Sequence, residues 1–499
     1  MKYIHKYTTW ILLIICFVGI FLRLLGFGMI PSSLNRDEAA LGYNAYSLLK
    51  TGMDEWGVSW PIVFRSFGDY KLAGYIYSLI PFVSIFGLNQ WVVRVPSLIA
   101  GILLILISYF LVLQITKDKV FGLLTAFFIS LTPWAIHYSH VGFEANLALF
   151  FFVFSLTLAG DKRGICIVLS TVAMMLSLLT YNAPLVLLPG IVGLLFFAQK
   201  RIYLQPLLFV GIGILVFALV FPATKGKGNI TIFSNQQLME QSRQARANSE
   251  TYSIQRVLSN PLFFVIPTLT RNYFSSYDPQ FLVKGGGSNP WHQPPGWGHM
   301  SWSLVLLFAI GITFAWKIYP QHKQRVLLYG SLLISPLASA ITIDAPQATR
   351  MLFFLYMFVI FAAIGMRWLI TYNKTFAFLM TCILLIEVSL YMRLYLCEFS
   401  THPQIEWGVG TQRALLEVEK QRSQDMNVVV YGDTHYAYIY PLFYLAVNPD
   451  IFRSSVQYYP LDNLGLSQVK SFGHFRFSAQ IDAQNKEKYT VKILEDVRE

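Results

Sequence analysis

The chain has 499 residues, of which 55% are hydrophobic and 13% charged, with a mean hydropathy of +0.51. These values indicate a polytopic membrane protein and exclude an ordinary soluble domain. The net charge of +12 does not indicate nucleic-acid binding, since Lys and Arg are spread between apolar runs, and the four cysteines show neither disulfide nor metal-ligand spacing.

Apolar runs recur along the first part of the chain. A window of roughly 20 residues, the length that crosses a bilayer, identifies about eleven of them. The first run follows Lys2 and Lys6 as a signal peptide would, but it is too long and lacks a convincing cleavage site, so we expect it to stay as the first helix. The runs are 10–29, 91–113, 119–136, 143–159, 164–181, 184–198, 205–222, 301–316, 325–343, 350–370 and 375–396.

The connections between these runs predict the orientation. Every second connection is short and basic, and such connections face the cytoplasm. We therefore expect an integral protein of a bacterial-type plasma membrane with a cytoplasmic N-terminus. Three long segments, 30–90, 223–300 and 397–499, then lie outside with most of the acids. The basic residues on the inner side are Lys2, Lys6, Lys117, Lys119, Lys162, Arg163, Lys200, Arg201, Lys317, Lys323, Arg325, Arg367 and Lys374.

The long segments have structure of their own. In the first, helical spacing at Ala39–Leu49 and Leu72–Phe86 predicts two helices along the membrane interface. The second contains a predicted helix at Ile254–Phe274 and a Trp-, His- and Pro-rich stretch, 291–298, that we expect to be a folded binding loop rather than disordered.

The last segment predicts a separate small domain. After Leu396 a buried strand at Asn427–Gly432 lies between helices at Val409–Arg422 and Tyr436–Leu445. The predicted fold class is therefore mainly α, with a transmembrane domain at 1–396 and an extracytoplasmic α/β domain at 397–499.

Several ionisable residues gather at the predicted outer ends of the runs. Charges at membrane depth are costly and usually face a cavity or one another, so their common depth predicts a site. Each also has a structural interpretation, as a first-turn acid, a snorkelling cation or a satisfied interfacial histidine. They are Asp37, Glu38, Asp69, Lys71, His137, His140, Glu144, His292, Asp344 and Arg350.

Four motifs, in order along 1–396, resemble the GT-C glycosyltransferases, in the branch of protein O-mannosyltransferases and the lipid A aminoarabinose transferase. Arg36-Asp37-Glu38 is similar to the family's Asp-Glu motif. Asp69-Tyr70-Lys71 is similar to its acidic-x-Lys segment, although the usual Pro-Pro is missing. The stretch 137–144 ends in Glu144 where Asp is more usual. In 344–350, Arg350 is kept and Gln347 replaces a His.

The resemblance implies transfer of one sugar, with inversion, from a polyprenyl-phosphate donor to an acceptor protein, lipid or glycan on the outer face. Asp37 is expected to be the general base, and Lys71 and Arg350 to bind the donor phosphate. Glu144 is expected to shape the sugar or acceptor pocket. Further site candidates are Glu38, Asp69, His140 and His292, the last on the acceptor side. The sequence indicates no cofactor and no metal ligands, and leaves a divalent metal open.

Two other classes of function stay open. A transporter or flippase for lipid-linked sugars would also have many spans, but broken helices or paired repeats are typical of it. A lipid-linked glycan ligase or polymerase usually depends on basic groups in a large outer loop. An essential carboxylate after the first run favours the transferase.

The orientation is testable with single cysteines placed near Asp37, Glu144, His292 and after Leu396. We expect a membrane-impermeant thiol reagent to label all four on intact cells, because the positive-inside pattern places them outside. Lys162→Cys is the control and should label only after permeabilisation. Labelling of Lys162→Cys on intact cells, without labelling after Leu396, would contradict both the topology and an outer-face site.

Overall fold

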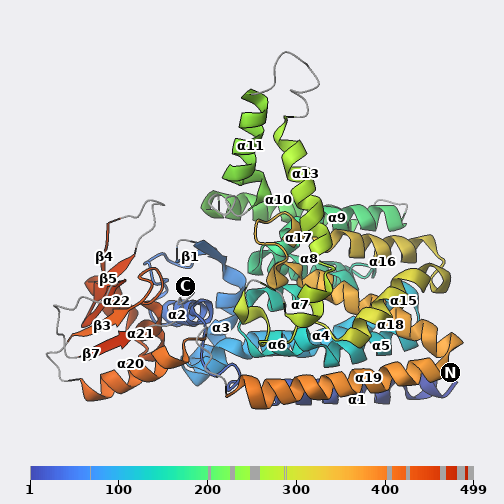
Figure 1. Ribbon diagram of the computed structural model, residues 1–499, viewed down its shortest axis with the longest axis horizontal. Helices are drawn as coiled ribbons and strands as arrows, with labels where there is room; N and C mark the ends of the chain where they lie inside the picture. Colours follow the sequence, from blue (N-terminus) through green and yellow to red (C-terminus); the bar gives the residue numbers. More distant parts are fainter. Residues whose placement is uncertain are drawn as a thin grey trace. The chain divides into compact units, whose positions relative to one another are not determined.

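The computed structural model describes residues 2–67, 69–199, 204–224, 231–247, 259–285, 287, 289–401, 407–422, 427–460, 468–479 and 489–492, and these are mostly helical (Figure 1). They form two compact units. The helical unit comprises Met1–Leu22, Gly101–His137 and Ala148–Tyr391, and the mixed unit comprises Arg23–Ala100, Tyr138–Leu147 and Met392–Glu499. The predicted division into 1–396 and 397–499 stays a prediction.

Each predicted apolar run coincides with one helix or with two consecutive helices, so the predicted fold class is confirmed. Among the described residues, five helices are long and apolar enough to cross a membrane. The helices α5 and α6 are bent by 55° relative to each other and give a sixth candidate if they form one span. Five more apolar helices are shorter. The helices are α1 (Lys2–Leu24), α4 (Gln90–Thr116), α5 (Lys119–Leu131), α6 (Pro133–His140), α7 (Glu144–Leu158), α8 (Gly164–Thr180), α9 (Ala183–Gln199), α10 (Leu204–Thr224), α15 (Trp302–Ile318), α16 (His322–Ile334), α17 (Leu337–Ala340), α18 (Leu352–Tyr372) and α19 (Lys374–Arg393).

Among the five long apolar helices, α18 is the most deeply buried, and it packs closely on α15. A Cβ atom on Gly311 would lie 1.8 Å from the carbonyl oxygen of Phe361, and one on Gly365 would lie 1.9 Å from that of Leu307. Next to this crossing the rings of Phe308 and Phe358 stack at 3.9 Å. Small residues of this kind let two membrane helices approach each other closely, so dispersion contacts hold the pair.

The long segment between α10 and α15 is folded over the described residues. It contains η2 (Ile232–Ser234), α11 (Gln236–Ala247), α13 (Pro261–Ser275), α14 (Pro279–Lys284) and η3 (Pro290–His292). The predicted helix at Ile254–Phe274 corresponds to α13, while 254–258 lies outside the described residues. The start of α13 follows from local chemistry, because the Asn260 side chain accepts from the Leu262 N–H and Pro261 needs no N–H partner. The stretch 291–298 is folded, as predicted, and its binding role stays a prediction.

In the mixed unit, two helices and a hairpin follow α1. The predicted interfacial helices are present as α2 (Arg36–Thr51) and α3 (Ala73–Phe86). Between them β1 (Val63–Ser66) pairs antiparallel with β2 (Asp69–Leu72). The sequence did not predict this hairpin, since strands of four residues are too short to establish a two-residue period. Strand β2 leads directly into α3, and Lys71 lies at this junction.

The end of the chain forms a five-stranded mixed sheet in the order β4-β5-β6-β3-β7. Strand β3, which lies between β6 and β7, runs parallel to both neighbours and is buried along its whole length, as predicted for Asn427–Gly432. The helix predicted at Tyr436–Leu445 is shorter, and follows a turn at 433–438. The elements are α20 (Val409–Gln421), β3 (Val428–Tyr431), α21 (Ile439–Tyr444), α22 (Pro449–Ser455), β4 (Gln457–Tyr458), β5 (Val469–Phe472), β6 (Phe475–Ser478) and β7 (Tyr489–Lys492), after a π-helical turn at Leu394–Phe399.

This C-terminal region supports α2. The helices α21 and α22 both pack on it. The Tyr43 hydroxyl donates to the Val447 carbonyl at 3.1 Å, the Ser33 and Tyr444 hydroxyls bond at 2.7 Å, and the Arg36 guanidinium lies 4.2 Å from the centre of the Tyr436 ring. The first turn of α2 therefore rests on residues some four hundred positions later in the chain.

Candidate functional site

The first turn of α2 places two consecutive acids in different surroundings. The Asn35 side chain accepts from the Glu38 N–H at 2.9 Å, and the Glu38 carboxylate accepts from the Asn35 N–H at 3.2 Å. This capping box turns Glu38 back into the protein. Glu38 is fully buried, whereas the Asp37 side chain is 36% exposed. Asp37 is therefore the acid of the pair that a ligand can reach.

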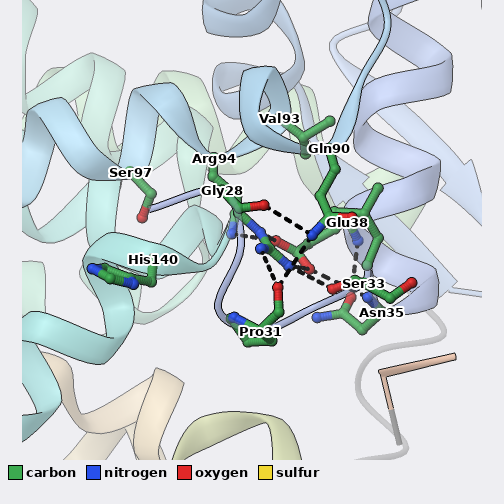
Figure 2. A network of polar contacts seen from close by, with 12 residues as sticks. Gly28, Pro31, Ser33, Asn35, Glu38, Gln90, Val93, Arg94, Ser97 and His140 are labelled. Atoms are coloured by element: carbon green, nitrogen blue, oxygen red, sulfur yellow. Dashed lines mark hydrogen bonds and ion pairs between the residues drawn. The ribbon is translucent and has the colours of Figure 1, made fainter. Parts of the chain in front are cut away.

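Glu38 is occupied by a buried ion pair with Arg94, near the start of α4 (Figure 2). The Arg94 Nε donates to Glu38 Oε1 at 2.9 Å, and its two terminal nitrogens donate to the carbonyls of Pro31 and Ser33 at 2.7 and 2.6 Å. The Gly142 N–H donates to the same Glu38 oxygen at 2.8 Å. One carboxylate thus joins the loop before α2, the start of α4 and the turn before α7, which gives Glu38 a structural role.

Lys71 lies between the two carboxylates that the sequence singled out. Its Nζ is 3.3 Å from Asp37 Oδ1 and 3.4 Å from Glu144 Oε1. The side chains of Lys71 and Glu144 are 14% and 13% exposed. These residues come from β2, the first turn of α2 and the first turn of α7. The structure therefore brings a base candidate, a cation and a second acid together at one partly buried position.

Of the other predicted residues in the mixed unit, His140 belongs to the packing of the loop before α2. It is fully buried, its Nδ1 lies 3.2 Å from the Ile30 carbonyl oxygen, and its ring packs edge-on against Phe27 and Tyr395. Asp69 pairs with Ser66 in the hairpin, and its side chain lies outside the described residues.

Arg350 and His292 belong to the helical unit. Arg350, in the short turn η4 (Ala348–Met351), forms an ion pair with Asp344, and its N–H donates to the Gln347 side chain at 2.9 Å. His292 is buried in η3. Burial, with His299, His137 and Arg350 nearby, holds the pKa of His292 well below its usual range, so this imidazole is neutral at physiological pH.

The sequence analysis overlooked Arg94. The signal was available, since an arginine within the apolar run 91–113 is costly and requires a buried partner. Its partner could not be chosen from the sequence, because any of the acids in 30–90 was eligible. For a metal, no group of three or more His, Cys, Asp or Glu side chains with suitable geometry occurs among the residues that the structure describes.

No protein-family model and no curated protein matches the sequence. Among solved structures, the chain is similar to the oligosaccharyltransferase AglB of Archaeoglobus fulgidus in complex with an inhibitory peptide and a dolichol-phosphate. The TM-score is 0.50 at 13% identity, over 89% of this chain and 64% of that one. The chain has the GT-C fold.

Two further solved structures are similar to this chain. A complex of the Archaeoglobus enzyme with Zn and sulfate has a TM-score of 0.50 at 13% identity, over 87% of this chain and 61% of that one. ArnT of Cupriavidus metallidurans with undecaprenyl phosphate gives 0.49 at 13%, over 88% and 84%. The chain spans less than two thirds of the oligosaccharyltransferase chains. It is an integral membrane protein.

The Glu38–Arg94 pair predicts a large effect of Arg94→Met on stability. Removing one partner of a buried ion pair leaves the other charge unpaired and costs about 3–5 kcal/mol. Glu38→Gln should cost less, because the amide oxygen still accepts from Gly142. Arg163→Met, which breaks an exposed pair with Asp161, is the control and should change little. Thermal unfolding of the purified variants measures all three effects. Equal losses of stability for Arg94→Met and Arg163→Met would contradict a stabilising role of the Glu38–Arg94 ion pair.

Proposed function

We propose that this protein is an inverting glycosyltransferase that moves a single sugar from a polyprenyl-phosphate donor to a hydroxyl acceptor on a protein, lipid or glycan. The observation that carries the proposal is the Lys71 ammonium held between Asp37 and Glu144. The GT-C fold supports it, as does the dolichol-phosphate in the AglB complex. The predicted side of the reaction, the outer face, rests on the charge pattern and on the family resemblance.

In this proposal Asp37 is the general base. Lys71 contacts Oδ1 of Asp37, which leaves Oδ2 as the oxygen to accept the proton of the acceptor hydroxyl. A bond then forms between the acceptor oxygen and the anomeric carbon, while the bond to the phosphate oxygen breaks on the opposite face of the sugar. The lipid phosphate leaves with the electron pair. Because phosphate is a good leaving group, one base suffices, in contrast to the two carboxyl groups of a glycosidase.

Lys71 serves the phosphate as well as the acids. An ammonium has three N–H donors, so Lys71 can keep a carboxylate and still donate to a phosphate oxygen. In a partly buried position this charge stabilises the anion that grows on the leaving group. Glu144 also holds Lys71 and lines the sugar or acceptor pocket. The pair of acids keeps the cation in place before the donor arrives.

Arg350 is the second proposed ligand of the donor phosphate. Its guanidinium can bind two phosphate oxygens at once, which a lysine cannot. Its ion pair with Asp344 keeps the guanidinium ordered at the start of α18. This assignment rests on the resemblance of 344–350 to the family pattern. It is the less direct of the two, since Gln347 replaces the expected His and caps η4 instead.

Transfer of an oligosaccharide is the second candidate, favoured by the fold of AglB. Both candidates use a lipid-linked donor and one base, so the site does not separate them. Mass analysis of lipid-linked and surface glycans, with and without the gene, distinguishes the two candidates. A mass difference of one sugar supports the proposal, and loss of a whole glycan favours the second candidate. The cation between two acids favours either over a flippase, which needs no base.

The roles of the two acids predict unequal losses of activity. Asp37→Asn removes the base and should lower the transfer rate by roughly 10²–10⁴-fold. Glu144→Gln should lower it less, because an amide can still orient neighbours by hydrogen bonding. Asp161→Asn, a change at an exposed acid paired with Arg163, is the matched control. Transfer rates of purified protein in proteoliposomes measure the order, and an inactive Glu144→Gln beside a near-normal Asp37→Asn would exchange the roles.

Measurements of donor binding distinguish the proposed phosphate-binding cations from the proposed base. Lys71→Ala and Arg350→Ala should each weaken binding of a short polyprenyl phosphate by roughly ten- to a hundredfold, the cost of one charge-assisted contact. Asp37→Asn should keep this affinity, because the base does not contact the phosphate. In Lys71→Ala two acids are also left without their cation, so adding Glu144→Gln should restore part of the affinity. Unchanged titrations for both cation variants would leave the function resting on Asp37 alone.

A further inference from the structure

A narrow apolar cavity lies inside the helical unit, between α4, α7, α9, α16 and α18. The volume open to the centres of water-sized spheres is about 70 Å³. We call this cavity the slot. Its walls are almost entirely apolar, with Leu111, Leu156, Leu195, Leu327, Phe353 and Ile360 among the lining residues.

A second, polar recess adjoins the slot. It offers about 480 Å³ at the ends of α4 and α7, and Lys117, Asp161 and Lys162 line it. Gln114 and Gly160 line both spaces, so the slot and the recess meet there. The exposed Lys323 lines the slot and adds a third cation. Since Asp161 is engaged by Arg163 at 2.7 Å, the recess presents a net positive charge.

The slot and the recess border the C-terminal parts of α4 and α7. Leu111 follows Arg94 by seventeen residues on α4, which corresponds to roughly 25 Å along the helix axis. Leu156 follows Glu144 by twelve residues on α7, or roughly 18 Å. The slot and recess thus lie at the opposite ends of these two helices, at the end where the predicted cytoplasmic connections gather.

We propose that the slot and the recess together bind an anionic phospholipid. One acyl chain occupies the slot, and the phosphate lies against Lys117, Lys162 and Lys323. Each part of the lipid answers one observation: an apolar slot for the chain and a cluster of cations for the phosphate. Basic pockets between membrane helices on the cytoplasmic side are suited to such headgroups.

The chemistry favours a phospholipid over the other phosphate-bearing molecules. Free phosphate has no chain for the slot. A polyprenyl phosphate is the proposed donor lipid and enters the experiment as a competitor. A zwitterionic lipid carries its own cation, which the lysines repel. Phosphatidylglycerol has the phosphate and the chain without a cation, and is the probe of choice.

The experiment compares lipids and variants in detergent-solubilised full-length protein, by native mass spectrometry and thermal unfolding. Phosphatidylglycerol should bind and raise the unfolding temperature more than phosphatidylcholine does. Lys117→Ala with Lys323→Ala should weaken its binding by roughly tenfold or more, as expected for lost charge-assisted contacts. Lys317→Ala with Lys374→Ala removes the same charge from exposed helix ends that line neither space, and should have little effect.

Ala159→Phe, which fills the slot, tests the acyl chain separately from the charges. It should reduce phosphatidylglycerol binding while transfer from the polyprenyl donor is kept. Equal binding of the two phospholipids, or equal weakening by both lysine pairs, would overturn the proposal. So would undecaprenyl phosphate displacing phosphatidylglycerol in a Lys71→Ala background, because the site would then belong to the donor lipid. The lipid-binding outcomes do not depend on whether the proposed transferase activity is correct.

Discussion

The buried ion pair between Glu38 and Arg94 is the constraint on which the candidate site depends. Both side chains are excluded from water, so their charges are tolerable only if nearly every donor and acceptor is satisfied. The partners that do so are backbone groups of Pro31, Ser33 and Gly142. The pair therefore fixes backbone as well as side chains. Asp37 is the neighbour of Glu38, and Glu144 follows Gly142 by two residues. The Glu38–Arg94 ion pair therefore determines where Asp37 and Glu144 can lie.

Burial separates the roles of two adjacent carboxylates. Asp37 and Glu38 follow each other in one helical turn, but the capping box turns one inward to Arg94 and leaves the other to Lys71. A buried, fully bonded carboxylate stabilises, and a partly exposed one beside a cation can exchange a proton with a ligand. The C-terminal sheet contributes to this arrangement, because α21 and α22 support the helix that carries both acids.

The two ends of α4 and α7 present different chemistry to their surroundings. The starts of these helices hold the ion pair and Glu144, while their far ends border the apolar slot and the lysine-lined recess. The same two helices thus carry residues of the proposed chemistry and residues of the proposed lipid site.

The sequence by itself determined the membrane class, the position of nearly every apolar helix and the buried strand β3, because these follow from hydrophobic length and period. It also indicated Asp37, Lys71 and Glu144 through a family resemblance, and the tertiary structure brings these three together. Local pattern could not predict the hairpin that presents Lys71, the partner of Arg94, or the inward turn of Glu38, since each depends on segments distant in the chain. Asp37 and Glu38 are both acidic residues, and their types do not distinguish their roles. Only the packing around them decides which one forms the buried ion pair and which one a substrate can reach.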